Sequence, residues 1–273
     1  MTAPFAEVIG DPAAHSKSPS IHKYWLAALG LAGDYRATPV RHDGLADFFA
    51  ERRGDPDWVG CNVTIPHKQA AMPLLDRIDA RAAAIGAVNC IVPGAKGLTG
   101  YNSDVDGVAA ALASTPLHGR KAALIGAGGS ARAAIRHLLD AGAPEISILA
   151  RDSEKAAASA PDPRIRIHAF GDFSAAFDGA VAIVNATPLG MTGAPPMPEA
   201  MLAAVFRHAR GATLLDMVYD PLETPFLAAG RSGGGMPVDG LVMLIGQARA
   251  AFRLFFGREP PPGDEKLRAL LVG

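Results

Sequence analysis

The chain has 273 residues, of which 49% are hydrophobic and 19% are charged, and its formal net charge is −1. This composition predicts a folded protein with a large core rather than a disordered chain, and the length favours two domains. A nearly neutral chain lacks the charge excess that is typical of nucleic-acid binders and polybasic membrane binders. We expect neither a signal peptide nor a membrane span, because the sequence shows no basic segment before an apolar one and no run of about 18 apolar residues.

The two cysteines and eight histidines do not form a recognisable metal-binding pattern. Cys61 and Cys90 each lie in an apolar, strand-like stretch, which predicts the buried free thiols of a cytoplasmic protein rather than a disulfide. Neither a Cys-x-x-Cys motif nor a paired histidine spacing occurs, so we expect no metal site.

Short strands and helices alternate through the first part of the chain. We expect strands at residues 5–9, 34–40 and 58–63, a turn and strand at 86–92, helices at about 20–29, 45–53 and 79–85, and a hairpin turn at 94–97. Polar side chains follow the strands: Ser16 and Ser18 come after the first, and Asn62 and Thr64 lie at the end of the third. Since α/β proteins bind ligands at the carboxyl ends of strands, Asn62 and Thr64 are candidates for a binding site.

Three of the polar residues have an inert interpretation beside the functional one. Ser18 precedes a helix and Asp104 opens another, so each could serve only as an N-cap. Lys68 follows Pro66 and is expected in the first turn of the next helix. A cation there opposes the helix dipole, so a purely structural role for Lys68 is slightly disfavoured. An isolated lysine is nevertheless usually just solvated, and the local sequence leaves both interpretations open for all three residues.

A strand, turn and helix in the middle of the chain have the pattern of a dinucleotide-binding motif. The apolar strand 122–125 precedes Gly126-x-Gly128-x-x-Ala131, and a helix at about 130–141 follows. The first glycine permits a tight turn, the second lets the backbone approach a diphosphate, and the alanine lets the helix pack closely on its strand. The helix N-terminus adds N–H groups and a partial positive charge. The pattern predicts nucleotide binding, the alternative being an ordinary glycine-rich turn.

The remaining sequence repeats the alternation of strands and helices. We expect strands at 145–150, 165–168, 181–185, 213–216 and 236–238, helices near residues 153, 198 and 225, a long helix at about 241–256 and a last helix at 264–271. Such alternation predicts a parallel sheet that is covered on both faces, and therefore an α/β fold. The long helix is apolar nearly all round, so we expect it to be buried.

Taken together, the polar and glycine-rich segments resemble the shikimate dehydrogenases. The resemblance rests, in chain order, on Gly10-x-Pro12-x-x-His15-Ser16-x-Ser18-Pro19-x-x-His22, Asn62-Val63-Thr64-Ile65-Pro66-His67-Lys68, Gly86-Ala87-Val88-Asn89, Tyr101-Asn102-Ser103-Asp104-x-x-Gly107, Gly126-Ala127-Gly128-Gly129, Asn185-Ala186-Thr187-Pro188-x-Gly190-Met191, Asp216-Met217-x-Tyr219 and Asp239-Gly240-x-x-Met243-Leu244-x-x-Gln247-Ala248. These segments cover essentially the whole chain in the right order.

The resemblance implies two α/β domains, a Rossmann-like NADP-binding domain (residues 104–239) being inserted into a substrate domain built from both chain ends (residues 1–103 and 240–273). It implies Lys68 and Asp104 as the catalytic residues, which also hold the substrate. The other shikimate-binding residues are then Ser16, Ser18, Asn62, Thr64, Asn89, Tyr219 and Gln247, with Asn102 as loop support. The implied cofactor-binding residues are Gly126, Ala127, Gly128, Gly129, Ser130, Ala131, Arg151, Thr187, Met217 and Gly240.

These residue types suit the implied substrate. Shikimate carries one carboxylate and three ring hydroxyl groups. Serine and tyrosine hydroxyls and a helix terminus can bind the carboxylate without a buried cation, while amides and hydroxyls can bind the ring hydroxyls. Hydride transfer also needs a proton partner. Lys68 fits as the general acid of the reduction and the general base of the reverse reaction, oriented by Asp104, because a lysine is an acid at neutral pH.

The sequence departs from the family pattern in two segments. Ser103 stands where threonine is usual, and Ala150-Arg151-Asp152 replaces the Asn-Arg-Thr of NADP-using members. Arg151 stands where an arginine binds the 2′-phosphate of NADP, whereas an acidic residue facing the ribose favours NAD. Neighbouring side chains of an extended segment point to opposite sides, so Asp152 can instead cap the helix near residue 153. We expect NADP, with NAD as the alternative.

The expected activity is the reversible, NADPH-dependent reduction of 3-dehydroshikimate to shikimate in aromatic amino-acid and chorismate biosynthesis. The alternatives are an NAD-dependent quinate/shikimate dehydrogenase of catabolic type, a folate dehydrogenase of similar architecture and a non-catalytic nucleotide-binding module. The complete set of substrate residues speaks against the folate enzyme, and Lys68 and Asp104 speak against the inactive module. We expect a small-molecule substrate, no nucleic acid or membrane partner, and a cytoplasmic monomer or homodimer.

Overall fold

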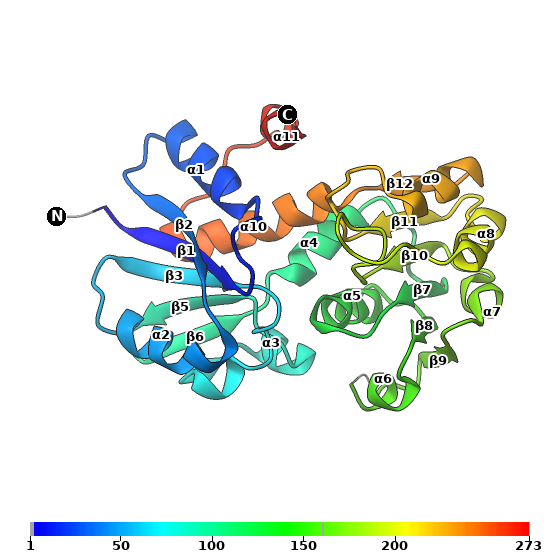
Figure 1. The fold of residues 1–273 in the computed structure, drawn as a ribbon, viewed down its shortest axis with the longest axis horizontal. Coiled ribbons are helices and arrows are strands. Elements are labelled where there is room, and N and C mark those ends of the chain that lie inside the picture. The colour runs from blue at the N-terminus through cyan, green and yellow to red at the C-terminus, as the bar shows by residue number, and fades with distance from the viewer. Residues whose placement is uncertain (1–2, 160, 273) are drawn as a thin grey trace. The chain divides into compact units, whose positions relative to one another are not determined.

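The computed structural model describes residues 3–159 and 161–272, and the chain folds into two compact units (Figure 1). The first unit comprises Met1–Ser103 and Leu244–Gly273, and the second comprises Asp104–Met243. The chain therefore crosses between the units twice, and the second crossing lies inside the helix Gly240–Phe256 (α10). The sequence placed that crossing at the start of the helix. The difference arises because Met243 packs into a hydrophobic core of the second unit.

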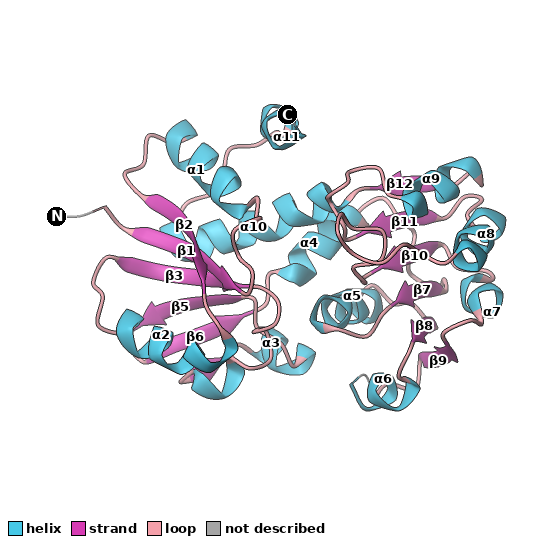
Figure 2. Cartoon of the chain, in the orientation of Figure 1, coloured by secondary structure: helices cyan, strands magenta, loops and turns pink. Residues whose placement is uncertain are grey.

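The first unit contains a mixed sheet of six strands in the order β2-β1-β3-β5-β6-β4. The strands are β1 (Phe5–Gly10), β2 (Asp34–Pro39), β3 (Trp58–Val63), β4 (Arg77–Ile78), β5 (Cys90–Gly94) and β6 (Gly97–Tyr101). β1 is parallel to β2 and β3, whereas β5 is antiparallel to β3 and β6. The helical elements are α1 (Ser18–Ala28), α2 (Leu45–Arg52), α3 (Ala80–Ile85), most of α10, α11 (Glu265–Val272) and the 3₁₀ helices η1 (His42–Gly44) and η2 (Met72–Leu74) (Figure 2).

Alternate residues of β1 point to opposite faces of this sheet, and each face carries its own hydrophobic core. Phe5 belongs to a core that includes Phe48 of α2. Ala6 belongs to a second core, which includes Phe255 of α10. β1 is therefore buried on both faces, which explains why its sequence is almost continuously apolar.

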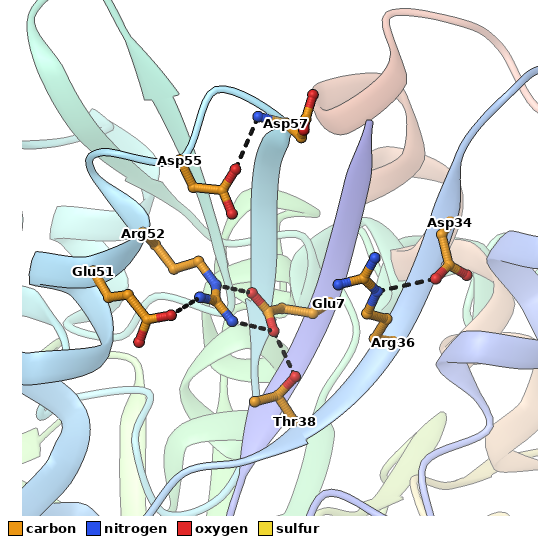
Figure 3. Close-up of polar contacts among 8 residues, drawn as sticks. All are labelled: Glu7, Asp34, Arg36, Thr38, Glu51, Arg52, Asp55 and Asp57. Carbon is orange, nitrogen blue, oxygen red and sulfur yellow. Dashed lines mark hydrogen bonds and ion pairs between the residues drawn. The ribbon is translucent and has the colours of Figure 1, made fainter. Parts of the chain in front are cut away.

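Glu7 interrupts this apolar strand and is fully buried. Its carboxylate accepts hydrogen bonds from the Arg52 Nε atom at 2.7 Å and from the Thr38 hydroxyl group (Figure 3). The Arg52 guanidinium lies over the Phe48 ring, 4.9 Å from the ring centroid, so the ion pair is set against apolar side chains. The pair joins β1 to α2, and Thr38 adds β2. Removal of Arg52 would leave the buried Glu7 carboxylate without its counter-charge.

The second unit contains a parallel sheet of six strands in the order β12-β11-β10-β7-β8-β9. The strands are β7 (Ala122–Ile125), β8 (Ile146–Ala150), β9 (Ile165–Ala169), β10 (Ala182–Asn185), β11 (Thr213–Asp216) and β12 (Met236–Val238). The chain starts at the central strand β7, proceeds outward to β9, and then returns to build the other half from β10 to β12. This is the Rossmann order, in which ligands bind outside the carboxyl ends of the strands where the order reverses, here between β7 and β10.

Helices cover both faces of the parallel sheet, which confirms the predicted α/β fold. They are α4 (Asp104–Ala111), α5 (Gly129–Asp140), α6 (Ser153–Ser159), α7 (Phe173–Phe177), α8 (Glu199–His208), α9 (Pro225–Ser232) and the first turn of α10. Side chains of α4 and α5 join one core, and side chains of α7, α8 and α9 join the other. In the part of the chain that the structure describes, no helix combines the length and the apolar character needed to span a bilayer.

Candidate active site

Backbone hydrogen bonds draw together the loops that follow the strands of the first unit. The Thr64 N–H donates to the Ile9 carbonyl at 2.9 Å, so the segment after β3 is attached to the end of β1. The Val88 N–H donates to the Lys68 carbonyl at 2.8 Å, which attaches the same segment to the loop before β5. Thr64 and Lys68 are therefore held beside the loop that carries Asn89.

A series of buried side-chain hydrogen bonds runs through this region. The Asn62 Nδ2 atom donates to the Asn89 carbonyl at 3.0 Å, and the Ser103 N–H donates to Asn89 Oδ1 at 2.7 Å. The Ser103 hydroxyl accepts from Asn89 Nδ2 at 3.0 Å and donates to Gln247 Oε1 at 3.3 Å. All four residues are buried. The structure thus brings together three residues that the sequence singled out, from β3, the loop before β5 and α10.

Ser16 and Ser18 lie at the N-terminus of α1. The helix begins at Ser18, and the Ser16 hydroxyl accepts a hydrogen bond from the Ser18 N–H at 3.2 Å. The interpretation of Ser18 as the N-cap is therefore wrong. Lys17 occupies the cap position, and the Ser16 hydroxyl accepts the hydrogen bond from the first backbone N–H group of the helix. Ser18 is instead buried, and its side chain lies near the hydroxyl group of Tyr35 in β2, to which the sequence assigned no role.

Lys68 lies in a run of turns and not in a helix. Residues 65–71 form consecutive turns, in which the His67 N–H donates to the Thr64 carbonyl at 2.9 Å. The His67 side chain anchors the segment, because its Nε2 atom lies 2.6 Å from the Val40 carbonyl oxygen. The expected position of Lys68 in a first helical turn is therefore wrong, and the opposing helix dipole does not bear on this lysine.

Asp104 and Tyr219 belong to the second unit. Asp104 is the first residue of α4 and is buried, so it lies within the helix rather than at the cap position before it. A carboxylate in the first turn interacts favourably with the helix dipole. Tyr219 lies in the loop after β11, and burial raises the pKa of its hydroxyl group.

The glycine turn follows β7, at the switch point of the second unit. Gly126 has a φ of +103°, which favours glycine, and an added Cβ atom would lie 2.8 Å from Thr187 Cγ2. Gly128 is exposed, and an added Cβ atom there would meet nothing within 4 Å, so the turn is open to a ligand. α5 begins at Gly129, and Ala131 in its first turn is fully buried. The turn therefore fits a diphosphate bound at a helix N-terminus.

The other cofactor candidates also follow strands of this parallel sheet. They are Arg151 after β8, Thr187 after β10, Met217 after β11 and Gly240 after β12. The Gly126 N–H donates to the Leu149 carbonyl at 2.8 Å, which attaches the glycine turn to the end of β8. Arg151 and Asp152 come next, and both are exposed. Because α6 begins at Ser153, Asp152 occupies the position of an N-cap residue.

A buried group of hydrogen bonds supports two of these loops. Asp216 accepts from Asn185 Nδ2 at 2.9 Å, from the Val218 N–H at 3.0 Å and from the Thr224 hydroxyl at 2.6 Å. Asn185 Oδ1 also accepts from the Thr187 hydroxyl at 2.6 Å. Burial raises the pKa of Asp216 from 3.8 to about 6, although the three donors act in the opposite direction. Asn185 and Asp216 stand in two of the family motifs, but the motifs alone do not reveal that these residues hold the two loops together.

Within the described part of the chain, the cysteine, histidine and acidic side chains show no grouping of metal-site type. Cys61 and Cys90 are both buried thiols, as the sequence predicted. Among residues 3–159 and 161–272, no three His, Cys, Asp or Glu side chains are placed so that they could hold a metal ion.

Three family models match the chain in succession. The shikimate dehydrogenase substrate binding domain matches residues 8–91, and the shikimate / quinate 5-dehydrogenase model matches residues 108–189. The shikimate 5′-dehydrogenase C-terminal domain matches residues 240–264. The matches therefore include segments of both units.

The chain is also similar to known proteins over nearly its whole length. It is 47% identical to the shikimate dehydrogenase (NADP(+)) of Sphingopyxis alaskensis, over 99% of this chain and 97% of that protein. It is 33% identical to the Thermus thermophilus shikimate 5-dehydrogenase solved in complex with NADP(H) and shikimate, with a TM-score of 0.85 over 99% of this chain and 100% of that one. The quinate dehydrogenase of Corynebacterium glutamicum in complex with NAD gives 29% identity and a TM-score of 0.83, over 99% of each chain. On these matches, the protein belongs to the shikimate dehydrogenase family.

Proposed function

We propose that the protein is an NADP-dependent shikimate dehydrogenase, which reversibly reduces 3-dehydroshikimate to shikimate in aromatic amino-acid biosynthesis. The observation that carries the proposal is the buried series of Asn62, Asn89, Ser103 and Gln247. Its members are uncharged amides and a hydroxyl, which can bind ring hydroxyl groups as donors or acceptors. Relatives with this named activity, one of them at 47% identity, support the same conclusion.

The substrate carboxylate is assigned to the N-terminus of α1. Ser16 and Ser18 stand there, and the positive end of a helix of 11 residues favours an anion without a buried cation. Asn62, Thr64, Asn89, Tyr219 and Gln247 are assigned to the rest of the substrate. A site that hydrogen-bonds each hydroxyl rejects analogues that leave one of its groups unpaired.

Proton transfer is assigned to Lys68, with Asp104 as its partner. When bound, a nicotinamide cofactor supplies the hydride. Lys68 Nζ donates a proton to the substrate oxygen as the ketone becomes a hydroxyl, and it accepts that proton in the reverse reaction. The Asp104 carboxylate orients the ammonium group and accepts a hydrogen bond from the substrate.

The cofactor is assigned to the carboxyl edge of the parallel sheet. The residues are Gly126, Ala127, Gly128, Gly129, Ser130, Ala131, Arg151, Thr187, Met217 and Gly240. The open position at Gly128 and the start of α5 support the diphosphate assignment. Arg151 is exposed directly after β8, where its guanidinium can bind a 2′-phosphate.

An NAD-dependent quinate/shikimate dehydrogenase is the second candidate, because Asp152 follows Arg151 directly. Quinate carries an extra hydroxyl on the carbon that bears the carboxylate. Ser18 is buried, so space for that hydroxyl is limited. We expect shikimate to be preferred in kcat/KM by at least about tenfold, or about 1.4 kcal/mol.

The test is the formation of reduced nicotinamide by the purified protein, with shikimate or quinate and with NADP+ or NAD+ in turn. The proposal expects the highest kcat/KM for shikimate with NADP+. Equal values for quinate and shikimate, with NAD+ preferred, would establish the second candidate instead. Absence of activity with all four combinations would overturn both.

We also infer that the protein acts in the cytoplasm as a monomer or homodimer, with substrate and cofactor as its partners. The two buried thiols support a reducing compartment. Light scattering of the purified protein measures the assembly directly.

A further inference from the structure

Tyr35 reaches across a strand to one of the proposed substrate residues. β1 lies between β2, which carries Tyr35, and β3, which carries Asn62. Ala6 of β1 is the neighbour of Tyr35 in the strand register, and its small side chain leaves room for the phenol ring to cross. The Tyr35 hydroxyl donates to Asn62 Oδ1 at 2.6 Å. The contact therefore links two residues that are 27 positions apart and on strands that do not pair.

The phenol ring of Tyr35 is held firmly in place. It is fully buried, and the His22 imidazole from α1 stacks on it at a centroid distance of 4.0 Å. Phe255 from α10 lies 6.4 Å from it, also measured between ring centroids. Two helices thus fix the ring against the sheet, so the hydroxyl has a fixed position.

The Tyr35 hydroxyl is a donor to Asn62. It has one proton, which the 2.6 Å bond to Asn62 Oδ1 uses. Burial raises the pKa of Tyr35, which therefore stays a donor throughout the usual pH range. The hydroxyl thus orders the Asn62 amide at any such pH.

The orientation of the Asn62 amide follows from its two partners. Its Oδ1 atom accepts from Tyr35, and one N–H of its Nδ2 atom donates to the Asn89 carbonyl. A flipped amide would turn its oxygen toward that carbonyl and lose both bonds. The second N–H of Asn62 is therefore presented in one fixed direction, as a donor to a ligand.

We propose that Tyr35 is a positioning residue, which sets the affinity for the polyhydroxylated substrate by fixing the Asn62 amide before the substrate binds. This inference rests on the proposed function, in which Asn62 binds shikimate. A group that is already oriented loses less conformational freedom on binding. Removal of the Tyr35 hydroxyl would free the Asn62 amide, while the proton donor Lys68 keeps its own anchor to Val88.

Steady-state kinetics of Tyr35→Phe test the inference. We expect KM for shikimate to rise about tenfold, the effect of losing one hydrogen bond to an oriented group, with kcat and KM for NADP+ changed by less than about threefold. Tyr24→Phe is the matched control, because it makes the same change at a half-buried position of α1. A KM for shikimate within about twofold of the wild type in Tyr35→Phe would overturn the inference.

A double-mutant cycle with Asn62→Ala distinguishes positioning from a general loss of structure. If Tyr35 acts through Asn62, adding Tyr35→Phe to Asn62→Ala should change KM for shikimate much less than it does in the wild type. An undiminished effect would contradict the inference. A wild-type protein that does not oxidise shikimate at all would overturn the proposed function and the inference together, whereas an active wild type with an unaffected variant overturns only the inference.

Discussion

The imidazole of His22 lies flat against the phenol ring of Tyr35, with an interplanar angle of 11°. Both ring nitrogens of His22 are buried, and neither makes a hydrogen bond within the described part of the chain. Because a charged imidazole would be desolvated there, burial lowers the pKa of His22 from 6.5 to about 3. In the folded protein His22 is thus a neutral member of an aromatic cluster with Trp25 and Phe252.

The first prediction concerns acid stability. His22 is protonated below pH 6.5 in the unfolded chain, whereas in the folded chain it stays neutral until about pH 3. The free energy of unfolding therefore decreases as the pH falls between those values. His22→Phe should abolish that loss, which amounts to about 2 kcal/mol between about pH 6.5 and about pH 5. Urea unfolding followed by tryptophan fluorescence measures it, since both tryptophans, Trp25 and Trp58, belong to the first unit. His118→Gln, at an exposed position, is the control. The same acid sensitivity in His22→Phe and wild type would refute the assignment.

The second prediction concerns Asp216, whose shift has the opposite consequence. Its folded pKa of about 6 lies above the ordinary 3.8, so the folded state keeps the proton longer and stability falls as the pH rises from about 4 to 6. Relative to Asp216→Asn, which does not titrate, the wild type should lose up to about 3 kcal/mol between about pH 4 and about pH 7. Hydrogen exchange of amides in the second unit is the measurement. Parallel pH curves for the two proteins would show that Asp216 ionises normally.

The third prediction concerns proton transfer. Lys68→Ala should lower kcat by about two to four orders of magnitude, the usual contribution of a general acid or base, and should change the affinity for shikimate much less. Asp104→Asn should lower kcat as well, because Lys68 would lose the charged partner proposed for it. Lys96→Ala, in the exposed β5–β6 turn, is the control for loss of a lysine. Turnover near the wild-type value in Lys68→Ala would exclude Lys68 as the proton donor.

The fourth prediction concerns the cofactor. Arg151→Ala should raise KM for NADP+ by at least about tenfold and leave KM for NAD+ nearly unchanged, because only NADP+ carries the phosphate that the guanidinium is proposed to bind. Arg120→Ala, at another exposed position of the second unit, is the control. If the unmutated protein already prefers NAD+, Asp152 faces the ribose and the quinate candidate gains support.

Elements that depend on local sequence could be predicted from the chain alone. β11 and β12 have the predicted bounds, and α5 begins within one residue of the expected start. The glycine turn was recognisable because its spacing between Gly126 and Ala131 is set by the contacts of a single strand, turn and helix. The family was recognisable for the same reason, since its motifs are short runs of polar residues at strand ends.

Tertiary structure decided the features that depend on distant partners. Lys68 is in a turn because His67 is anchored to Val40, a contact that the run from Asn62 to Lys68 does not reveal. In the first unit, β5 pairs antiparallel with both β3 and β6. Its pairing with β3 likewise depends on how strands far apart in the chain assemble.

The sequence by itself determined which residue types stand at the ends of the strands, because a strand, its turn and the next helix are encoded by adjacent residues. Only the tertiary structure decided that Tyr35 crosses β1 to Asn62 and that Glu7 pairs with Arg52. In sequence, Tyr35 is one more large residue of a strand, and Glu7 is one charge in an apolar run. Their partners are fixed by the order of the strands and by the helix packed on each face, and those depend on burial across the whole unit.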